Sequence, residues 1–168
     1  MADFGRGIKA GVVAGIIYGI IIGILEIILM AGMWNTIAAG YSGLTPGIEL
    51  SLAILAPSAF IGAIVGGIIG GIIFGLIYAA IYNSLPGSSS VAKGIVLAII
   101  FWLIFSIGIG FTTVAIFGMT YYILNSVIIG FIGSLIWGFL LGRFWDKYGS
   151  KQPAAQPIAE QSTEEKIE

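Results

Sequence analysis

Glu26 is the residue whose surroundings in the sequence are most suggestive of chemistry. It is the only ionisable residue well inside a long apolar segment, and it follows Gly23 by three residues. Residues three apart on a helix are neighbours, so the carboxylate is expected to face the same adjacent helix as the glycine. Acidic side chains placed within a membrane commonly mark ion or proton sites.

Four polar residues are expected at a similar depth and are the candidate partners of that carboxylate. They are Thr112, Thr113, Asn125 and Ser126. No lysine or arginine is expected at this end of the molecule, so an ion pair within the chain is unavailable. Two interpretations stay open: an ion or proton site, or a protonated glutamic acid that is hydrogen-bonded across a helix interface or faces a lipid headgroup.

The composition argues against an enzyme. The chain has no cysteine and no histidine, and its net charge is −1. It therefore lacks disulfides and the usual haem, copper and catalytic zinc ligands, and nothing in its charge suggests nucleic-acid binding. No nucleophile elbow or phosphate loop is present. We expect a protein without catalytic activity, cofactor or metal.

The elements that must position Glu26 are membrane-spanning helices. The chain is 58% hydrophobic and 9% charged, with a mean hydropathy of +1.08. A hydrocarbon core of about 30 Å needs roughly 20 apolar residues. Four segments meet this length, near 8–34, 57–82, 91–112 and 121–145. The sequence predicts an all-α domain of four transmembrane helices over residues 1–148, followed by a disordered tail over 149–168.

The basic residues predict the orientation. All seven lie at the N-terminus, in the second connection or at the C-terminus: Arg6, Lys9, Lys93, Arg143, Lys147, Lys151 and Lys166. Cytoplasmic loops carry the excess of lysine and arginine in membrane proteins. We therefore expect an integral protein of the cell membrane with both termini in the cytoplasm.

The first connection, 35–56, is expected to lie outside and to contain a short helical segment over 46–56. Thr45 and Pro46 resemble an N-cap followed by proline at the first helical position, with Glu49 in the first turn. The segment is either a helix lying at the outer interface, which we favour, or a proline-kinked extension of the second apolar helix.

Small residues recur every fourth position along three of the four segments. A four-residue step advances about 400° around a helix, so such residues form a ridge along which another helix can approach closely. The ridge residues that we expect to pack are Gly7, Gly11, Gly15, Gly19, Gly23, Gly62, Gly66, Gly67, Gly70, Gly71, Gly75, Gly130, Ser134, Gly138 and Gly142. The third segment, where Trp102 interrupts the pattern, is expected to pack more loosely.

The two halves of the chain also align with each other. Without gaps, Gly11 aligns with Gly94 and Gly75 aligns with Gly138, together with several isoleucines. The pattern suggests duplication of a two-helix hairpin, with the two halves arranged as parallel repeats.

The glycine-rich helices resemble the proteolipid ring subunits of rotary ATPases. That family carries its ion on a carboxylate near the middle of the second or fourth helix. The corresponding segments here, 57–82 and 121–145, have no acid in the middle. The resemblance therefore does not extend to function.

These features favour a non-catalytic structural or accessory subunit that lies in the lipid bilayer. It would form a homo-oligomer or brace other membrane subunits through its small-residue ridges. One alternative is a small channel or carrier that uses Glu26 as its ion or proton site. Another is a membrane-embedded envelope or shell protein.

Overall fold

The computed structural model describes residues 2–48 and 50–149 of the chain, and this part is all-helical. Three of its helical stretches are long and apolar enough to cross a membrane: Phe4–Gly32, Leu52–Ile81 and Ser90–Gly149. The all-α fold is thus confirmed, and an integral membrane location is compatible with it. Glu49 and the predicted tail after Gly149 lie outside the described residues.

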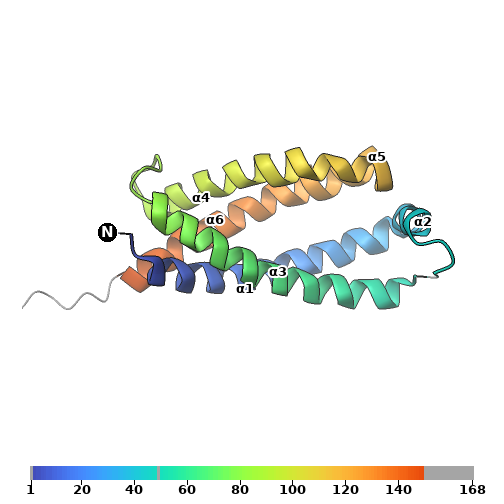
Figure 1. Ribbon diagram of the computed structural model, residues 1–168, viewed down its shortest axis with the longest axis horizontal. Coiled ribbons are helices and arrows are strands. Elements are labelled where there is room, and N and C mark those ends of the chain that lie inside the picture. Colours follow the sequence, from blue (N-terminus) through green and yellow to red (C-terminus); the bar gives the residue numbers. More distant parts are fainter. Residues whose placement is uncertain (1, 49, 150–168) are drawn as a thin grey trace, which may run out of the picture.

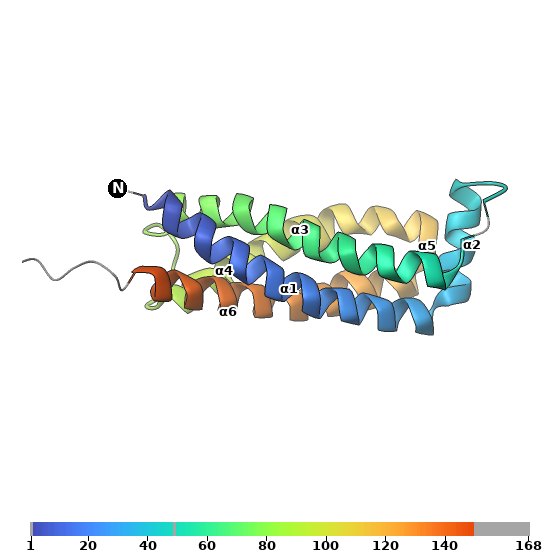
Figure 2. The same ribbon diagram turned by 90° about the horizontal axis from the view of Figure 1, so that it is seen from below.

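The first two long helices form an antiparallel pair along most of their length (Figures 1 and 2). Helix α1 (Phe4–Gly32) begins after Asp3, whose carboxylate accepts a hydrogen bond of 2.9 Å from the Arg6 backbone N–H. Helix α2 (Trp34–Leu44) follows directly after Met33. Helix α3 (Leu52–Ile81) then returns alongside α1.

The remaining sixty residues form one continuous helical stretch that folds back on itself. Its segments are α4 (Ser90–Phe101), the π-helix η1 (Trp102–Ile109), the 3₁₀ turn η2 (Gly110–Thr113), α5 (Val114–Tyr122), the π-helix η3 (Ile123–Ile129) and α6 (Gly130–Gly149). The reversal occurs at Gly118, whose φ of 81° and ψ of 169° are non-helical. Only glycine adopts this conformation without strain. Helix α6 consequently runs back beside α4 (Figure 1).

Helices α1 and α3 meet backbone to backbone. A Cβ atom added to Gly7, Gly11 or Gly15 would collide with the carbonyl oxygen of Gly75, Gly71 or Gly67 respectively. At the next step, a Cβ on Gly19 would lie 2.6 Å from the carbonyl oxygen of Ala63. Side chains are therefore excluded from α1 along four consecutive turns of the contact, and from α3 at Gly67, Gly71 and Gly75.

Helices α4 and α6 form a second close contact at the same end of the molecule, in the part of the third apolar segment that precedes Trp102. A Cβ added to Gly138 would lie 2.7 Å from Ile95 Cα and 2.9 Å from Ala98 Cβ. Gly94 lies against the Gly138 carbonyl in turn. A short run of small residues suffices at a crossing point, so the ridge need not continue past Trp102.

The outer segment also differs from the expectation. Thr45 closes α2 instead of opening a helix, and its hydroxyl donates a 2.9 Å hydrogen bond to the Tyr41 carbonyl. Helix α3 begins at Leu52, five residues before the predicted boundary, and continues through Pro57. The second alternative, an extension of the second apolar helix, is thus the observed one. The separate helix in this region is α2, within the predicted loop.

The α1–α3 contact can be tested at Gly11. We expect Gly11→Ala to lower the free energy of unfolding by about 1–3 kcal/mol, because its methyl group would force two backbones apart. Gly32→Ala is the control, since a Cβ there meets nothing within 4 Å. Thermal unfolding in detergent would measure both variants, and equal stability of the two would contradict the packing described.

Candidate functional site

Glu26 lies just beyond the point where α1 and α3 separate. A Cβ on Gly23 would meet the ring of Phe60 at 2.6 Å, whereas the earlier glycines face backbone. The Phe60 ring thus lies against Gly23 in the place where the α3 backbone lies against the earlier glycines of α1. Glu26 follows within one turn and is half-buried. The end of the close contact therefore leaves room for a polar side chain.

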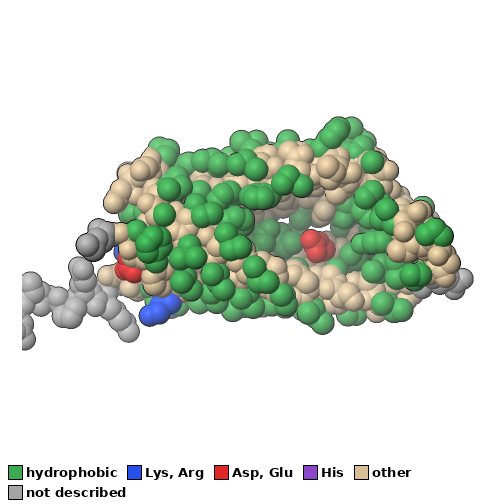
Figure 3. Space-filling view, in the orientation of Figure 1, with side chains coloured by type: hydrophobic (Ala, Val, Ile, Leu, Met, Phe, Trp, Pro, Cys, Tyr) green, Lys and Arg blue, Asp and Glu red, His purple; other side chains and the backbone are tan. Residues whose placement is uncertain are grey.

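A hollow between the two helical hairpins exposes an acidic side chain along the middle of the molecule (Figure 3). The acidic residues of the described chain are Asp3, Glu26 and Asp146. Asp3 and Asp146 lie beside Arg6, at the end of the bundle where α1 begins and α6 ends, which is called the inner end below. The acid in the hollow is consequently Glu26. Toward the outer end, α2 packs on α5, where the Tyr41 and Phe117 rings are 5.3 Å apart.

Two tyrosines lie near the Glu26 carboxylate. Within the described part of the chain, no hydrogen bond or ion pair reaches this carboxylate. Tyr18 and Tyr121 lie within range of its charge. Tyr18 is on the same helix, about two turns earlier. Phenol hydroxyls can donate to a carboxylate.

The four predicted partners of Glu26 are differently engaged. The Thr112 hydroxyl donates to the Ile109 carbonyl at 2.8 Å. The Thr113 hydroxyl likewise donates to a carbonyl one turn earlier on its own chain. Both threonine protons are therefore committed to backbone.

The other two predicted partners lie on η3, the π-helix that contacts α1. Asn125 is half-buried there. Ser126 is buried, with its side chain toward Gly110, and its carbonyl accepts a 3.0 Å hydrogen bond from Trp102 Nε1. Asn125 is thus the predicted partner whose position best suits contact with α1.

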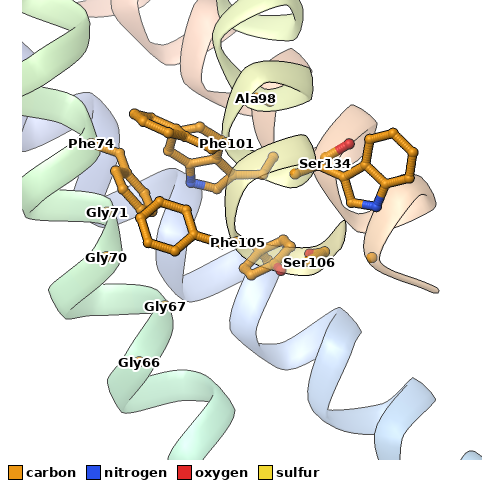
Figure 4. Close-up of a pocket in the computed structure, with 14 residues that line it drawn as sticks. Gly66, Gly67, Gly70, Gly71, Phe74, Ala98, Phe101, Phe105, Ser106 and Ser134 are labelled. Carbon is orange, nitrogen blue, oxygen red and sulfur yellow. The ribbon is translucent and has the colours of Figure 1, made fainter. Parts of the chain in front are cut away.

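A cavity of about 170 Å³ lies near mid-length of the bundle, between the two hairpins. Its wall on α3 is a glycine surface, which the rings of Phe74, Phe101 and Phe105 face from one side (Figure 4). Its other aromatic lining residues are Tyr18, Trp102 and Trp137, and Ser106 and Ser134 supply polar atoms. Tyr18 lines this cavity and also lies within range of the Glu26 charge, so it connects the two features.

The inner end of the bundle is closed by a hydrogen-bonded network around Ser90. The Ser90 hydroxyl donates to Asp146 Oδ1 at 2.5 Å. Since that donation uses its only proton, the Tyr82 hydroxyl donates to Ser90 Oγ at 2.6 Å. The Tyr78 hydroxyl donates to the Ser90 carbonyl at 2.5 Å. Three helical elements are joined at this one residue.

Arg6 brings α1 into the same network. Its Nε donates to the Trp145 carbonyl at 2.5 Å, and its guanidinium lies 4.2 Å from the centre of the Trp145 ring. The Tyr82 and Trp145 rings stack at 4.8 Å. On the other side of Tyr82, Lys93 donates to its carbonyl at 2.9 Å. Residues of α1, α3, α4 and α6 therefore meet at the inner end.

A family model of proteins of unknown function, DUF6789, matches residues 1–156. The chain belongs to this family. The match includes every helix of this DUF6789 protein, together with Glu26, the cavity and the inner network. Comparison with curated proteins and with solved structures gives no match.

Most of the predicted ridge residues of this DUF6789 protein lie at contacts between helices. Those on α1, and Gly67, Gly71 and Gly75 on α3, lie in the α1–α3 contact, and Gly138 and Gly142 lie against α4. Gly130 faces Trp102 and Ser106, and Ser134 is buried. Gly62 and Gly66 lie elsewhere, because a Cβ on either meets nothing within 4 Å. Gly70 approaches only Phe74 of its own helix.

Sequence reasoning did not identify the inner network or the two tyrosines. Tyr78, Tyr82, Trp145 and Ser90 belong to no motif in the sequence. The available signal was the tyrosine and tryptophan at the ends of the segments 57–82 and 121–145, together with Arg6 at the start of the first. Such residues anchor helices at an interface and also hydrogen-bond to each other when they converge.

The network can be tested at Ser90. We expect Ser90→Ala to lower the free energy of unfolding by about 1–3 kcal/mol, because the half-buried Tyr82 hydroxyl loses its acceptor and Asp146 loses its donor. Ser88→Ala, at an exposed position two residues earlier, is the matched control. Thermal unfolding of both variants provides the measurement. An unchanged midpoint for Ser90→Ala would show that the network does not stabilise the inner end.

Proposed function

We propose that this DUF6789 protein is a four-span, non-catalytic membrane subunit that assembles through an exposed face of α3. The α3 helix carries two small-residue ridges, and α1 occupies only the one that contains Gly67, Gly71 and Gly75. The other ridge is open at Gly62, where a Cβ would meet nothing within 4 Å, and it continues at Gly66 into the cavity between the hairpins. This unoccupied ridge is the observation that carries the proposal.

The flanks of the open ridge have the character of a helix-docking groove. Ile61, Val65 and Ile69 project beside it and are 61%, 48% and 54% exposed. In lipid, exposed apolar side chains alone do not favour the association of two helices, whereas a glycine groove allows a second helix to pack closely. The partner that fits is another apolar helix, either from a second copy of this chain or from another membrane subunit.

The turn at Gly118 supports the four-span topology. The stretch Ser90–Gly149 has 60 residues, which is long enough to cross a membrane twice, and its two arms lie side by side. Each arm would therefore cross once. The inner end carries Arg6, Lys9, Lys93 and Lys147, which supports a cytoplasmic location of both termini in the cell membrane.

The packing of the two hairpins supports the proposed duplication. Gly11 aligns with Gly94 and Gly75 with Gly138 in the ungapped comparison of the halves. A Cβ on Gly11 would lie 3.1 Å from Gly75 Cα, and a Cβ on Gly94 would meet the Gly138 carbonyl. Equivalent residues thus form the close contact in each hairpin. The π-helices of the second half would be later departures from the common pattern.

Disulfide cross-linking would test the assembly face. The chain has no cysteine, so Gly62→Cys introduces a single thiol on the open ridge. We expect oxidation in native membranes to give a disulfide-linked dimer, in which the thiols of two copies of the variant are joined. Ile28→Cys, on α1 and 62% exposed, is the control for random collision. Equal cross-linking of the two variants would contradict the proposal.

The second candidate function is a carrier or gated channel with Glu26 as its ion or proton site. The observation that favours it is a half-buried carboxylate in a hollow, without a cationic partner in the described chain. Tyr18, near Glu26, also lines the cavity deeper in the bundle. The network at Ser90 closes the inner end, so transport would require that network to open.

Flux measurements would test this second function. With purified protein in liposomes, we expect Glu26→Gln to reduce any proton or cation flux to the level of protein-free liposomes, because the ionisable group is lost. Glu26→Asp keeps the carboxylate and should retain flux. If wild-type protein gives no flux under pH and cation gradients, the carrier proposal fails while the assembly proposal stands.

A further inference from the structure

A cleft of about 640 Å³ opens at the inner end, between the start of α1 and the end of α6. Asp3, Gly5, Arg6 and Lys9 line it from the first helix, and Lys147 and Tyr148 line it from the last. Three cationic side chains thus converge on it against one carboxylate. That carboxylate already accepts the Arg6 backbone N–H as the cap of α1. The cleft is therefore suited to an anion.

Arg6 is held in place for such a ligand. Its side chain is 22% exposed, and its contacts with the carbonyl and ring of Trp145 fix the guanidinium. A guanidinium has five N–H donors, and the hydrogen bond to Trp145 uses one. Asp146 Oδ1 lies 4.0 Å from Nη2, at the limit of an ion pair. An arginine fixed in this way can donate to two oxygens of a phosphate group.

Apolar side chains are exposed immediately beside these cations. Phe4 and Ile8, one turn apart on α1, are 50% and 37% exposed. Each precedes a residue that lines the cleft, namely Gly5 or Lys9. A ligand at this place would meet positive charge in the cleft and apolar surface along the adjoining helix.

We propose that this cleft binds the phosphate headgroup of an anionic phospholipid, whose acyl chains lie along α1. The combination of cationic cleft and adjacent apolar surface selects a lipid over a free phosphate ester. Basic pockets between helices at the cytoplasmic side of a membrane are suited to acidic headgroups. This proposal requires a membrane location only, and it is independent of the assembly face on α3.

Native mass spectrometry of the detergent-solubilised protein, titrated with phosphatidylglycerol or phosphatidylcholine, would test the site. We expect phosphatidylglycerol to bind more tightly. Each lysine near an anionic headgroup contributes about fivefold, so the double variant Lys9→Gln/Lys147→Gln should bind phosphatidylglycerol about 30-fold more weakly. Both lysines are exposed, and thermal unfolding without lipid would verify that the variant is folded.

Arg143→Gln is the matched control, because it removes one positive charge at the same end from an exposed residue outside the cleft lining. It should bind phosphatidylglycerol nearly as the wild type does. Glycerol 3-phosphate, added in excess, should not displace the lipid. The proposal is overturned by equal binding of the two lipids, by an unchanged double variant, by an equal loss in Arg143→Gln, or by displacement with glycerol 3-phosphate.

Discussion

The structure depends on the approach of two glycine backbones, α1 against α3. Inside a lipid phase, burying an apolar side chain gains little, since lipid is as apolar as leucine. What remains is the number of atoms in van der Waals contact and the weak bonds from Cα–H groups to carbonyl oxygens. Glycine on both helices allows the closest approach of the two backbones, which increases both the van der Waals contact and the number of these weak bonds. The carbonyl oxygens of Gly67, Gly71 and Gly75 lie where side chains would otherwise be.

The location of Glu26 follows from the place where this contact ends. At Gly23 the partner is no longer a backbone but the ring of Phe60, which requires more space. Beyond this point the helices cannot remain as close, and the hollow of Figure 3 begins. The glycine contact between α1 and α3 closes this hairpin from Gly7 to Gly19, and its end at Gly23 therefore leaves an opening in the remaining outer part. The Phe60 ring thus marks both the end of the close packing of α1 on α3 and the start of the space that contains Glu26.

Much of the fold could be predicted from the sequence, because apolar length and small-residue spacing are local properties. The helical class and the long apolar helices were predictable in this way. The start of α3 was missed because Pro57 suggested a helix boundary, although proline is tolerated in an early turn of a membrane helix. Helix α2 was missed because its composition is only moderately apolar.

The candidate site was predictable only in part, because its geometry depends on which helices meet. The isolated carboxylate of Glu26 is evident in the sequence, but of its two nearby tyrosines only Tyr18 is on the same helix, and Tyr121 comes from a distant segment. Thr112 and Thr113 are at a suitable depth, yet their hydroxyls bond to their own helix. Ser90 has no distinguishing neighbours in the sequence. Its importance arises from the convergence of Tyr78, Tyr82 and Asp146 upon it.

The unequal closure of the two ends has a mechanical consequence. Polar and ring contacts hold the helices at the inner end, whereas α2 and α5 meet at the outer end through the Tyr41 and Phe117 rings and through Gly40, which lies against α5. Helix α1 has 29 residues and is about 43 Å long, and its close contact with α3 makes the two helices one arm. Pivoting this arm by about 5° at its anchored end would displace its far tip by about 4 Å. The width of the hollow that contains Glu26 would then change by about the size of a side chain.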